Sequence, residues 1–215
     1  MRKFITPFFL LILLASCGHG VGSLSGNVFW KYNNYVGNKP DAGSSIHLYP
    51  YEKKSKPLEA TADVQGNFRF DKVSSGDYLL IVVSENTTAS PDDIYRELFY
   101  SSRYLKDVFD FDFSTVKPDK QKEFQLQDSL NRNSLTNESV DFSNSTSSDK
   151  LLKDIEDRQK KEKQLRDIAQ EIIKAIPSDV SSKLGILINK VKLRRVTIEK
   201  DKTTTEVIDF GITYI

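Results

Sequence analysis

The spacing of hydrophobic residues changes along this 215-residue chain, and that change restricts the fold more than any other feature. From residue 24 to about residue 130, apolar and polar residues alternate in short runs separated by Gly, Pro, Asn and Ser, which is typical of β-strands joined by turns. From residue 149 the apolar residues recur every three or four positions, which is typical of an amphipathic helix. The fold class that we expect is therefore α+β, mainly β, with the helix in the second half.

The strand-rich region contains one long apolar run, residues 77–84, which we expect to be a central strand. Residues 60–64 and 67–70 flank Gly66, and this pattern predicts a β-hairpin with Gly66 in its turn. Period-two alternation predicts five buried side chains in this region: Phe68, Phe70, Tyr78, Leu80 and Val82. Residues 121–127 alternate again and predict the last strand.

The segment 85–120 is longer than a hairpin connection needs. Ser90 is followed by proline and two acidic residues, which indicates a helix start, and Ile94 and Leu98 then recur at helical spacing. Residues 108–113 return to a strand-like alternation. We interpret the segment as a flap that covers one edge of a sheet, with a binding loop as the alternative.

A family resemblance is carried by residues 25–28, 37–43 and 61–70 (SGNV, GNKPDAG and TADVQGNFRF) and by the apolar positions that follow, Val73, Tyr78, Leu80 and Val82. This set resembles the carboxypeptidase regulatory-like domain. The resemblance implies a transthyretin-like β-sandwich of about seven strands over residues 24–130. It implies almost nothing about function, which depends on sites added to the fold.

The second half begins with residues 131–148, which are rich in Asn and Ser and predict a linker. A long helix follows from residue 149 and ends at Pro177. Residues 157–163 contain no apolar side chain, which weakens any coiled-coil seam along this helix. Residues 178–190 fit either a second short helix or a strand.

The chain ends in a predicted β-hairpin, residues 192–199 and 203–214, which turns at Asp201 and Lys202. One face of its second arm is apolar: Ile208, Phe210, Ile212 and Tyr214. This face and the helix stripe through Ile168, Ile172 and Ile176 must both be covered. We favour docking of these faces on each other within the region 149–215 or on the sandwich, with part of the apolar surface left exposed for a partner protein.

The N-terminus has the pattern of an export signal over residues 1–16. Two basic residues precede a short apolar run, residues 8–15, which is shorter than the roughly 20 residues that span a bilayer. Residues 14–17, Leu-Ala-Ser-Cys, resemble the lipobox of bacterial lipoproteins, although an ordinary secretory signal with a chance cysteine is the alternative. The resemblance implies cleavage before Cys17, lipid such as diacylglycerol and palmitate on Cys17, and a place in the cell envelope. Because glycine follows Cys17, we expect the outer membrane, with residues 17–23 as a tether of about 20 Å.

Composition excludes several functions. Cys17 is the only cysteine, so the chain forms no disulfide. Without Arg2 and Lys3, 29 basic residues face 30 acidic ones, and this balance does not predict nucleic-acid binding. With two histidines and no nucleophile–base or metal-ligand spacing, we expect no enzyme activity, no catalytic residue, no metal and no cofactor.

Three aromatic residues, Trp30, Tyr32 and Tyr35, lie beside two asparagines, a combination that suits stacking against sugars. The alternative is that Trp30 is core and the tyrosines cover a loop. The basic residues at 190–195 fit anionic lipid or a solvated strand face. We therefore predict a membrane-anchored, non-enzymatic envelope protein that binds another protein, with glycan binding through residues 30–35 as the alternative.

Overall fold

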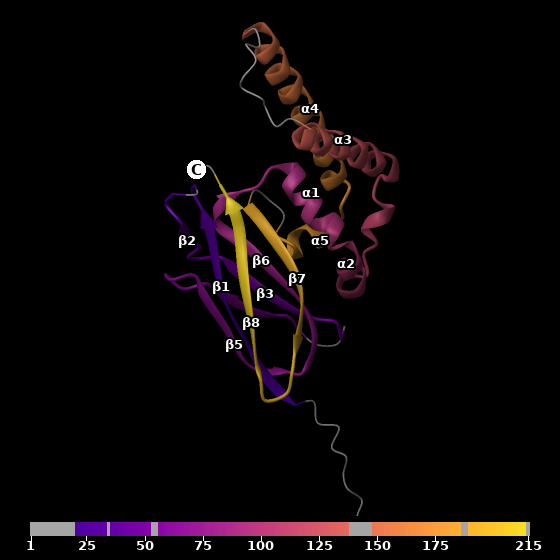
Figure 1. Ribbon diagram of the computed structural model, residues 1–215. Helices are drawn as coiled ribbons and strands as arrows, with labels where there is room; N and C mark the ends of the chain where they lie inside the picture. The colour runs from indigo at the N-terminus through magenta and orange to yellow at the C-terminus, as the bar shows by residue number, and fades with distance from the viewer. Residues whose placement is uncertain (1–19, 34, 53–55, 138–147, 186–188, 214–215) are drawn as a thin grey trace, which may run out of the picture.

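The structure is a computed structural model that describes residues 20–33, 35–52, 56–137, 148–185 and 189–213, without the side chains of 133–151. It has three layers: two β-sheets packed face to face, and a layer of helices on the outer face of one of them (Figure 1). The α+β class is confirmed. Helix and strand are present in about equal amounts, so the chain is less strand-rich than expected.

The first sheet is built around β1 (Val21–Lys31). On one side, β1 pairs antiparallel with β2 (Asn38–Pro40) and β5 (Asn67–Ser74). On its other side it pairs in parallel with β8 (Thr203–Ile212), so that the two ends of the chain share one sheet.

The second sheet has the order β4 (Leu58–Thr61), β3 (Ser45–Pro50), β6 (Gly76–Thr88) and β7 (Asn189–Ile198), and all its pairs are antiparallel. Strand β6 is central and both its faces are buried, as the apolar run predicted. Alternate residues contact different layers. Leu80 and Val82 face the first sheet, whereas Leu79 and Ile81 face the helices.

The core between the sheets confirms the predicted register. All five side chains expected there are buried: Phe68, Phe70, Tyr78, Leu80 and Val82. Gly66 lies in a turn with φ +78°, and a Cβ at that position would lie 2.3 Å from the carbonyl oxygen of Val28. Glycine is therefore required there by both conformation and space.

Both predicted hairpins are wrong in their pairing. Strand β4 lies in the second sheet and β5 in the first, so the turn at Gly66 joins two sheets. In the same way, β7 and β8 separate after a turn at residues 199–202 and join different sheets. Ile208 and Phe210 are buried as predicted, but Ile212 is 44 % exposed, because Gly211 at φ +73° interrupts the alternation. Tyr214 lies outside the described residues.

The helical layer comprises α1 (Pro91–Tyr100), α2 (Ser102–Phe109), the 3-10 turn η1 (Phe113–Thr115), α3 (Pro118–Asn137), α4 (Ser148–Lys174) and α5 (Ser178–Lys183). The predicted helix start at Ser90 is confirmed by a capping box with Asp93. The strands expected at 108–113 and 121–127 are absent: residues 108–113 run from the end of α2 through an irregular link to the start of η1, and residues 121–127 lie in α3. In α3, Phe124 is buried and Leu126 is 61 % exposed, because residues two apart point to different sides of a helix.

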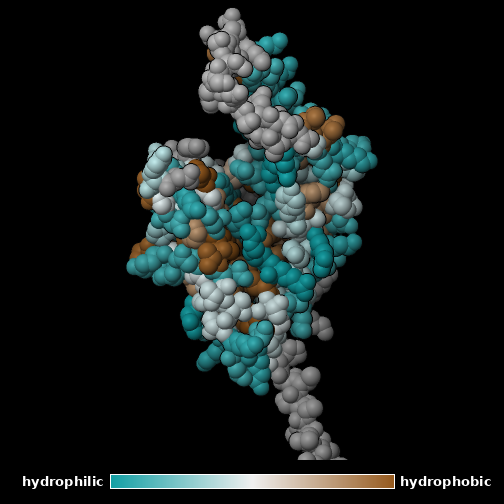
Figure 2. Space-filling view, in the orientation of Figure 1, coloured by the Kyte–Doolittle hydropathy of each residue, from teal (hydrophilic) through white to brown (hydrophobic). Residues whose placement is uncertain are grey.

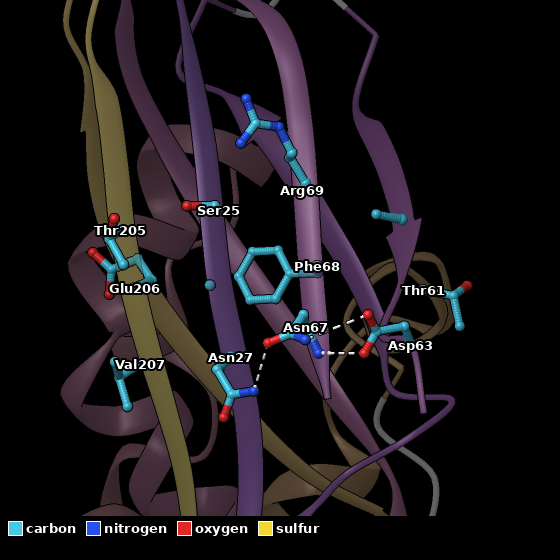
Figure 3. A pocket seen from close by; sticks show the side chains of 12 residues that line it. Ser25, Asn27, Thr61, Asp63, Asn67, Phe68, Arg69, Thr205, Glu206 and Val207 are labelled. Carbon is cyan, nitrogen blue, oxygen red and sulfur yellow. Dashed lines mark hydrogen bonds between the residues drawn. The ribbon is translucent and has the colours of Figure 1, made fainter. Parts of the chain in front are cut away.

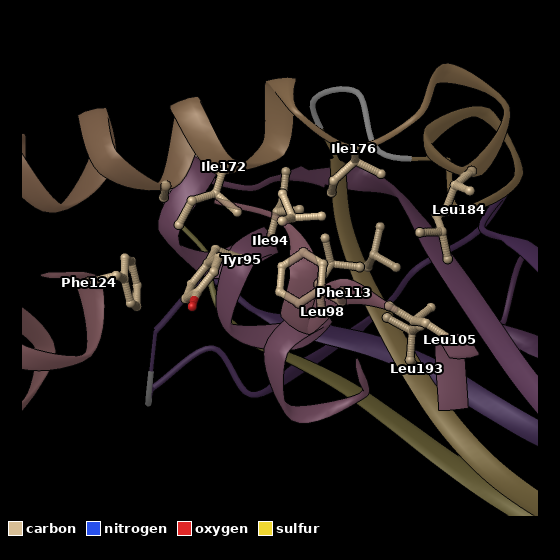
Figure 4. Close-up of a cluster of buried hydrophobic side chains, with 14 of the residues drawn as sticks. Ile94, Tyr95, Leu98, Leu105, Phe113, Phe124, Ile172, Ile176, Leu184 and Leu193 are labelled. Atoms are coloured by element: carbon tan, nitrogen blue, oxygen red, sulfur yellow. The ribbon is translucent and has the colours of Figure 1, made fainter. Parts of the chain in front are cut away.

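A second core joins the helices to the second sheet (Figure 4). Ile168, Ile172 and Ile176 of the predicted stripe are buried against it, together with Leu79 and Ile81 of β6. The C-terminal half of α4 therefore docks within the chain, which was the favoured expectation.

The expected boundaries at residues 24–130, 131–148 and 149–215 do not separate units in the structure. Strands β7 and β8 complete both sheets, and α4 packs on α1 and α3. Residues 131–137 belong to α3 rather than to a linker, and residues 21–23 of the expected tether belong to β1. The signal segment 1–16, Cys17 and residues 138–147 lie outside the described residues.

Candidate functional site

The aromatic loop does not form the predicted three-ring platform. Trp30 is 5 % exposed because its side chain belongs to the core between the sheets. The Lys39 ammonium lies 5.4 Å from the centre of the Trp30 ring and 5.8 Å from that of Tyr32. Trp30 therefore offers no open face to a sugar. Tyr32 is 43 % exposed and Tyr35 is 96 % exposed, so only the two tyrosines are accessible.

Asn33 holds the backbone of this loop. Its side-chain oxygen accepts hydrogen bonds from the backbone N–H groups of Tyr35 and Val36, at 2.9 and 2.8 Å. That oxygen is used locally, as in a turn closed by an asparagine side chain. Asn34 lies outside the described residues.

A shallow hollow of about 610 Å³ lies across β1, β5 and β8 (Figure 3). Most of its lining residues carry polar side chains, with Ser25, Asn27 and Thr205 among them. At one side, Asp63 accepts hydrogen bonds from the backbone of Asn67 and Gln65, and the Asn67 bond is the main cause that lowers the pKa of Asp63. The Asp63 carboxylate therefore closes the turn before β5 and is already satisfied.

The basic residues of β7 are used inside the fold. The Lys190 ammonium donates to the carbonyls of Phe210 and Ile212, each at 3.1 Å, and to the Thr213 hydroxyl at 2.8 Å. Burial lowers the pKa of Lys190. Arg195 pairs with Asp77 at 2.8 Å. These cations make contacts within the chain, while the Arg194 and Arg195 side chains remain 49 % and 43 % exposed.

The outer edge of β7 is closed by one carboxylate of α1. Oε1 of Glu97 accepts the backbone N–H of Leu193 at 2.8 Å. Lys192 approaches the other oxygen at 3.2 Å, and Arg194 lies 3.6 Å from Oε1. Because the Glu97 side chain is 15 % exposed, this network is largely sheltered from water. Because β7 is the last strand of its sheet, no neighbouring strand accepts the Leu193 N–H, and the Glu97 carboxylate does so instead.

The acidic residues near 110 have local structural roles. Asp112 accepts from the backbone N–H of Ser114 at 3.0 Å and caps η1, while Asp110 ends α2 with φ 57°. Within the described ranges, no group of three His, Cys, Asp or Glu side chains is placed to hold a metal ion.

The exposed aliphatic side chains gather on the helical end of the molecule. Of the six Leu and Ile side chains exposed in the described part of the chain, four lie on α3 and α4. Leu126 and Leu130 of α3 are 61 % and 50 % exposed, and Leu152 and Ile155 of α4 are 58 % and 44 % exposed. Figure 2 shows hydrophobic atoms among hydrophilic ones at this end. We call these four residues the helical apolar patch.

Sequence reasoning missed α3 and therefore missed half of this patch. Pro118 followed by Asp119 repeats the proline-then-acid helix start seen at Pro91, and this signal could have identified the helix. The Gln121 amide then fixes the first turn by donating to the carbonyls of Phe113 and Val116, at 2.7 and 2.6 Å. Lys120 reaches Glu171 of α4 at 3.9 Å.

None of the helices in the described part of the chain is long and apolar enough to cross a membrane.

No family model and no curated protein matches the chain. Among solved structures, the chain is similar to a protein from Pseudomonas aeruginosa provisionally described as a carbohydrate binding protein. The two share 11 % identity over 88 % of each chain, with a TM-score of 0.34. A TM-score this low does not establish a common fold.

Proposed function

We propose that this chain is a lipid-anchored, non-enzymatic protein of the bacterial envelope, held in the outer membrane by lipid on Cys17, that binds another protein through its helical apolar patch. The observation that carries the proposal is the position of that patch, because α3 and α4 hold four of the six exposed Leu and Ile side chains of the described residues. Leu126 and Leu130 are one helical turn apart on α3, and Leu152 and Ile155 are one turn apart on α4, so each helix presents a pair of neighbouring apolar side chains to a partner.

The two halves of α4 differ in a way that supports a partner. In its C-terminal half, Ile168 and Ile172 are 6 % and 0 % exposed, because they pack on the chain's own core. In its N-terminal half, Leu152 and Ile155 face solvent, and this half extends beyond the rest of the molecule (Figure 1). Burying a fully exposed Leu or Ile contributes about 1.5–3 kcal/mol, and covering the exposed part of one such side chain contributes roughly half of that. The exposed half therefore carries binding energy that the fold does not use.

The place of the proposed anchor also suits this function. Three peptide steps separate Cys17 from Gly20, which is a reach of about 10 Å at most. Strand β1 begins at the end of the sandwich that is opposite to α3 and the start of α4 (Figure 1). With Cys17 in the membrane, the helical apolar patch would point away from the lipid surface and toward a partner.

The anchor is tested by Cys17→Ala. The variant is expected to lose lipid labelling and to accumulate as an uncleaved precursor. Normal membrane fractionation together with normal processing of Cys17→Ala would contradict the lipoprotein proposal.

The binding surface is tested by cross-linking the protein to its neighbours in its own envelope. A double variant, Leu126→Glu with Leu130→Glu, is expected to lose a cross-linked species that the wild-type protein forms, because charge cannot be buried in an apolar contact without a large cost. Val64→Glu is the matched control, since Val64 is 75 % exposed in the turn before β5. Loss with Val64→Glu, or no loss with the double variant, would contradict the assignment of the surface.

The second candidate function is carbohydrate binding by Tyr32 and Tyr35. It is favoured by the 96 % exposure of Tyr35, since a large ring held fully in solvent is available for stacking. Tyr35→Ala is expected to abolish any signal on a glycan array. Tyr100→Ala, which removes a ring that is 66 % exposed on α1, should leave that signal unchanged.

A further inference from the structure

A pocket of about 320 Å³ lies between α1 and α3, apart from the helical apolar patch. Volumes of this order accommodate small organic molecules. Helix α1 contributes Tyr95, Phe99 and Tyr100 to its lining, and α3 contributes Phe124, Asp128 and Arg132. One part of the lining is therefore aromatic and another part is charged.

The aromatic part is a packed group of rings. The ring centres of Tyr95 and Phe124 lie 4.1 Å apart, and those of Tyr95 and Phe99 lie 5.9 Å apart in a stacked arrangement. Tyr95 and Phe99 are one helical turn apart on α1, so both rings reach the same side of the helix. Tyr95 and Phe124 are 1 % and 2 % exposed, so it is the partly exposed Phe99 that presents this aromatic wall to another ring.

The Tyr95 hydroxyl is the feature of the pocket that the fold does not explain. Tyr95 is 1 % exposed, and its hydroxyl has no hydrogen-bond partner among the described residues. Figure 4 shows the hydroxyl pointing away from Ile172 of α4. Burial raises the pKa of Tyr95 to about 12, so the group stays protonated at neutral pH and remains able to donate. Buried polar groups without partners are uncommon in folded proteins, and this one belongs to a residue that lines a pocket, which leaves its hydrogen available to an acceptor there.

The charged part of the pocket favours an anion. Both oxygens of Asp128 are engaged, one by Arg96 and the other by Arg132. Arg132 also donates to the Tyr100 hydroxyl at 3.0 Å, and the Arg96 guanidinium lies 5.5 Å from the centre of the Phe124 ring. The lining thus contains two guanidinium groups and one carboxylate, which leaves it net positive.

We propose that the pocket between α1 and α3 binds a small organic anion that carries a carboxylate on an aromatic body. The ring of the ligand packs on the aromatic wall, and its carboxylate accepts a hydrogen bond from the Tyr95 hydroxyl near the two guanidinium groups. Two sources offer this chemistry: a free aromatic acid, and the C-terminal aromatic residue of a peptide. The proposal does not depend on the lipid anchor or on the helical apolar patch.

The test is isothermal titration calorimetry on the purified full chain, kept free of detergent. The first probe is 3-phenylpropionate, and its neutral analogue 3-phenylpropanol tests the need for charge. A short peptide that ends in phenylalanine, with its C-terminal amide as control, tests the second source. We expect saturable binding of one of the two carboxylates, and the one that binds identifies the source. The matching neutral analogue should bind at least about tenfold more weakly, or about 1.4 kcal/mol.

Tyr95→Phe keeps the ring and removes the unpartnered hydroxyl, so the fold should remain intact. It is expected to weaken the binding of the carboxylate at least about tenfold. Tyr51→Phe is the matched control, because the Tyr51 hydroxyl is also buried without a partner in the described part of the chain but does not line this pocket. Absence of saturable binding by both carboxylates, equal binding of the neutral analogues, or full binding by Tyr95→Phe would overturn the proposal.

Discussion

Replacing Glu97 should show how much the closure of the β7 edge contributes to stability. Glu97→Ala removes the acceptor of the Leu193 N–H, and a buried donor left without a partner costs about 1–3 kcal/mol. It also removes the counter-charge of Lys192 and Arg194, whose side chains are 28 % and 49 % exposed. Because water can solvate both cations, this second loss adds at most about 1 kcal/mol. We expect Glu97→Ala to lower the free energy of unfolding by about 1–4 kcal/mol.

Urea denaturation measures this change, and hydrogen exchange of the Leu193 amide locates it. Glu123→Ala is the matched control, because Glu123 forms an exposed ion pair with Lys120 one turn away on α3 and should cost less than about 0.5 kcal/mol. Glu97→Gln keeps an acceptor oxygen and should fall between the two. Equal losses for Glu97→Ala and Glu123→Ala, or an unchanged Leu193 exchange rate, would refute the reasoning.

Three further predictions concern other parts of the fold. Gly66→Ala should lower the free energy of unfolding by at least about 1–2 kcal/mol in denaturation. Alanine would have to keep the left-handed backbone conformation of this position, and its Cβ would collide with the Val28 carbonyl oxygen. Hydrogen bonds from Thr197 and Arg195 lower the pKa of Asp77 below its ordinary 3.8, so its contribution is present above that pH and is lost as the pH falls through the lower folded-state pKa. Asp77→Asn should therefore flatten the acid limb of a stability–pH curve, and an unaltered limb would contradict this. Tyr95→Phe should leave the melting temperature unchanged or raise it, since it removes a buried hydroxyl without a partner among the described residues; a clear drop would show that the hydroxyl has a structural partner.

The sequence predicted which side chains are buried more reliably than it predicted which strands pair. Alternation placed Phe68, Phe70 and Leu80 in the core, because period two depends only on the local geometry of a strand. It could not show that β4 and β5 lie in different sheets, because a turn of the same length joins either kind of pair. The register of one strand is local information, whereas the choice of its partner is not.

The same limit explains the errors in the helical layer. Gln121–Gln127 alternates by chance, since Phe124 packs on α1 while Leu126 faces solvent on a different side of α3. The helical apolar patch and the pocket between α1 and α3 both depend on this helix, so neither could be predicted once the segment was assigned to a strand. Residue type alone left Trp30 open to either sugar binding or a place in the core, and the structure puts it in the core between the sheets.

The parallel pairing of β1 with β8 sets an order of events for the folding of the chain. Ser23 contacts Thr203 across this pair, 180 residues away in sequence. A chain that emerges with its N-terminus first cannot form the pair until nearly all of it is free, and contacts of such long sequence separation form slowly. The first sheet therefore stays incomplete until synthesis of the chain is nearly finished. Removing the last ten or so residues of the described chain would delete β8, with its buried Ile208 and Phe210. Even a small C-terminal truncation would therefore remove part of the core between the two sheets.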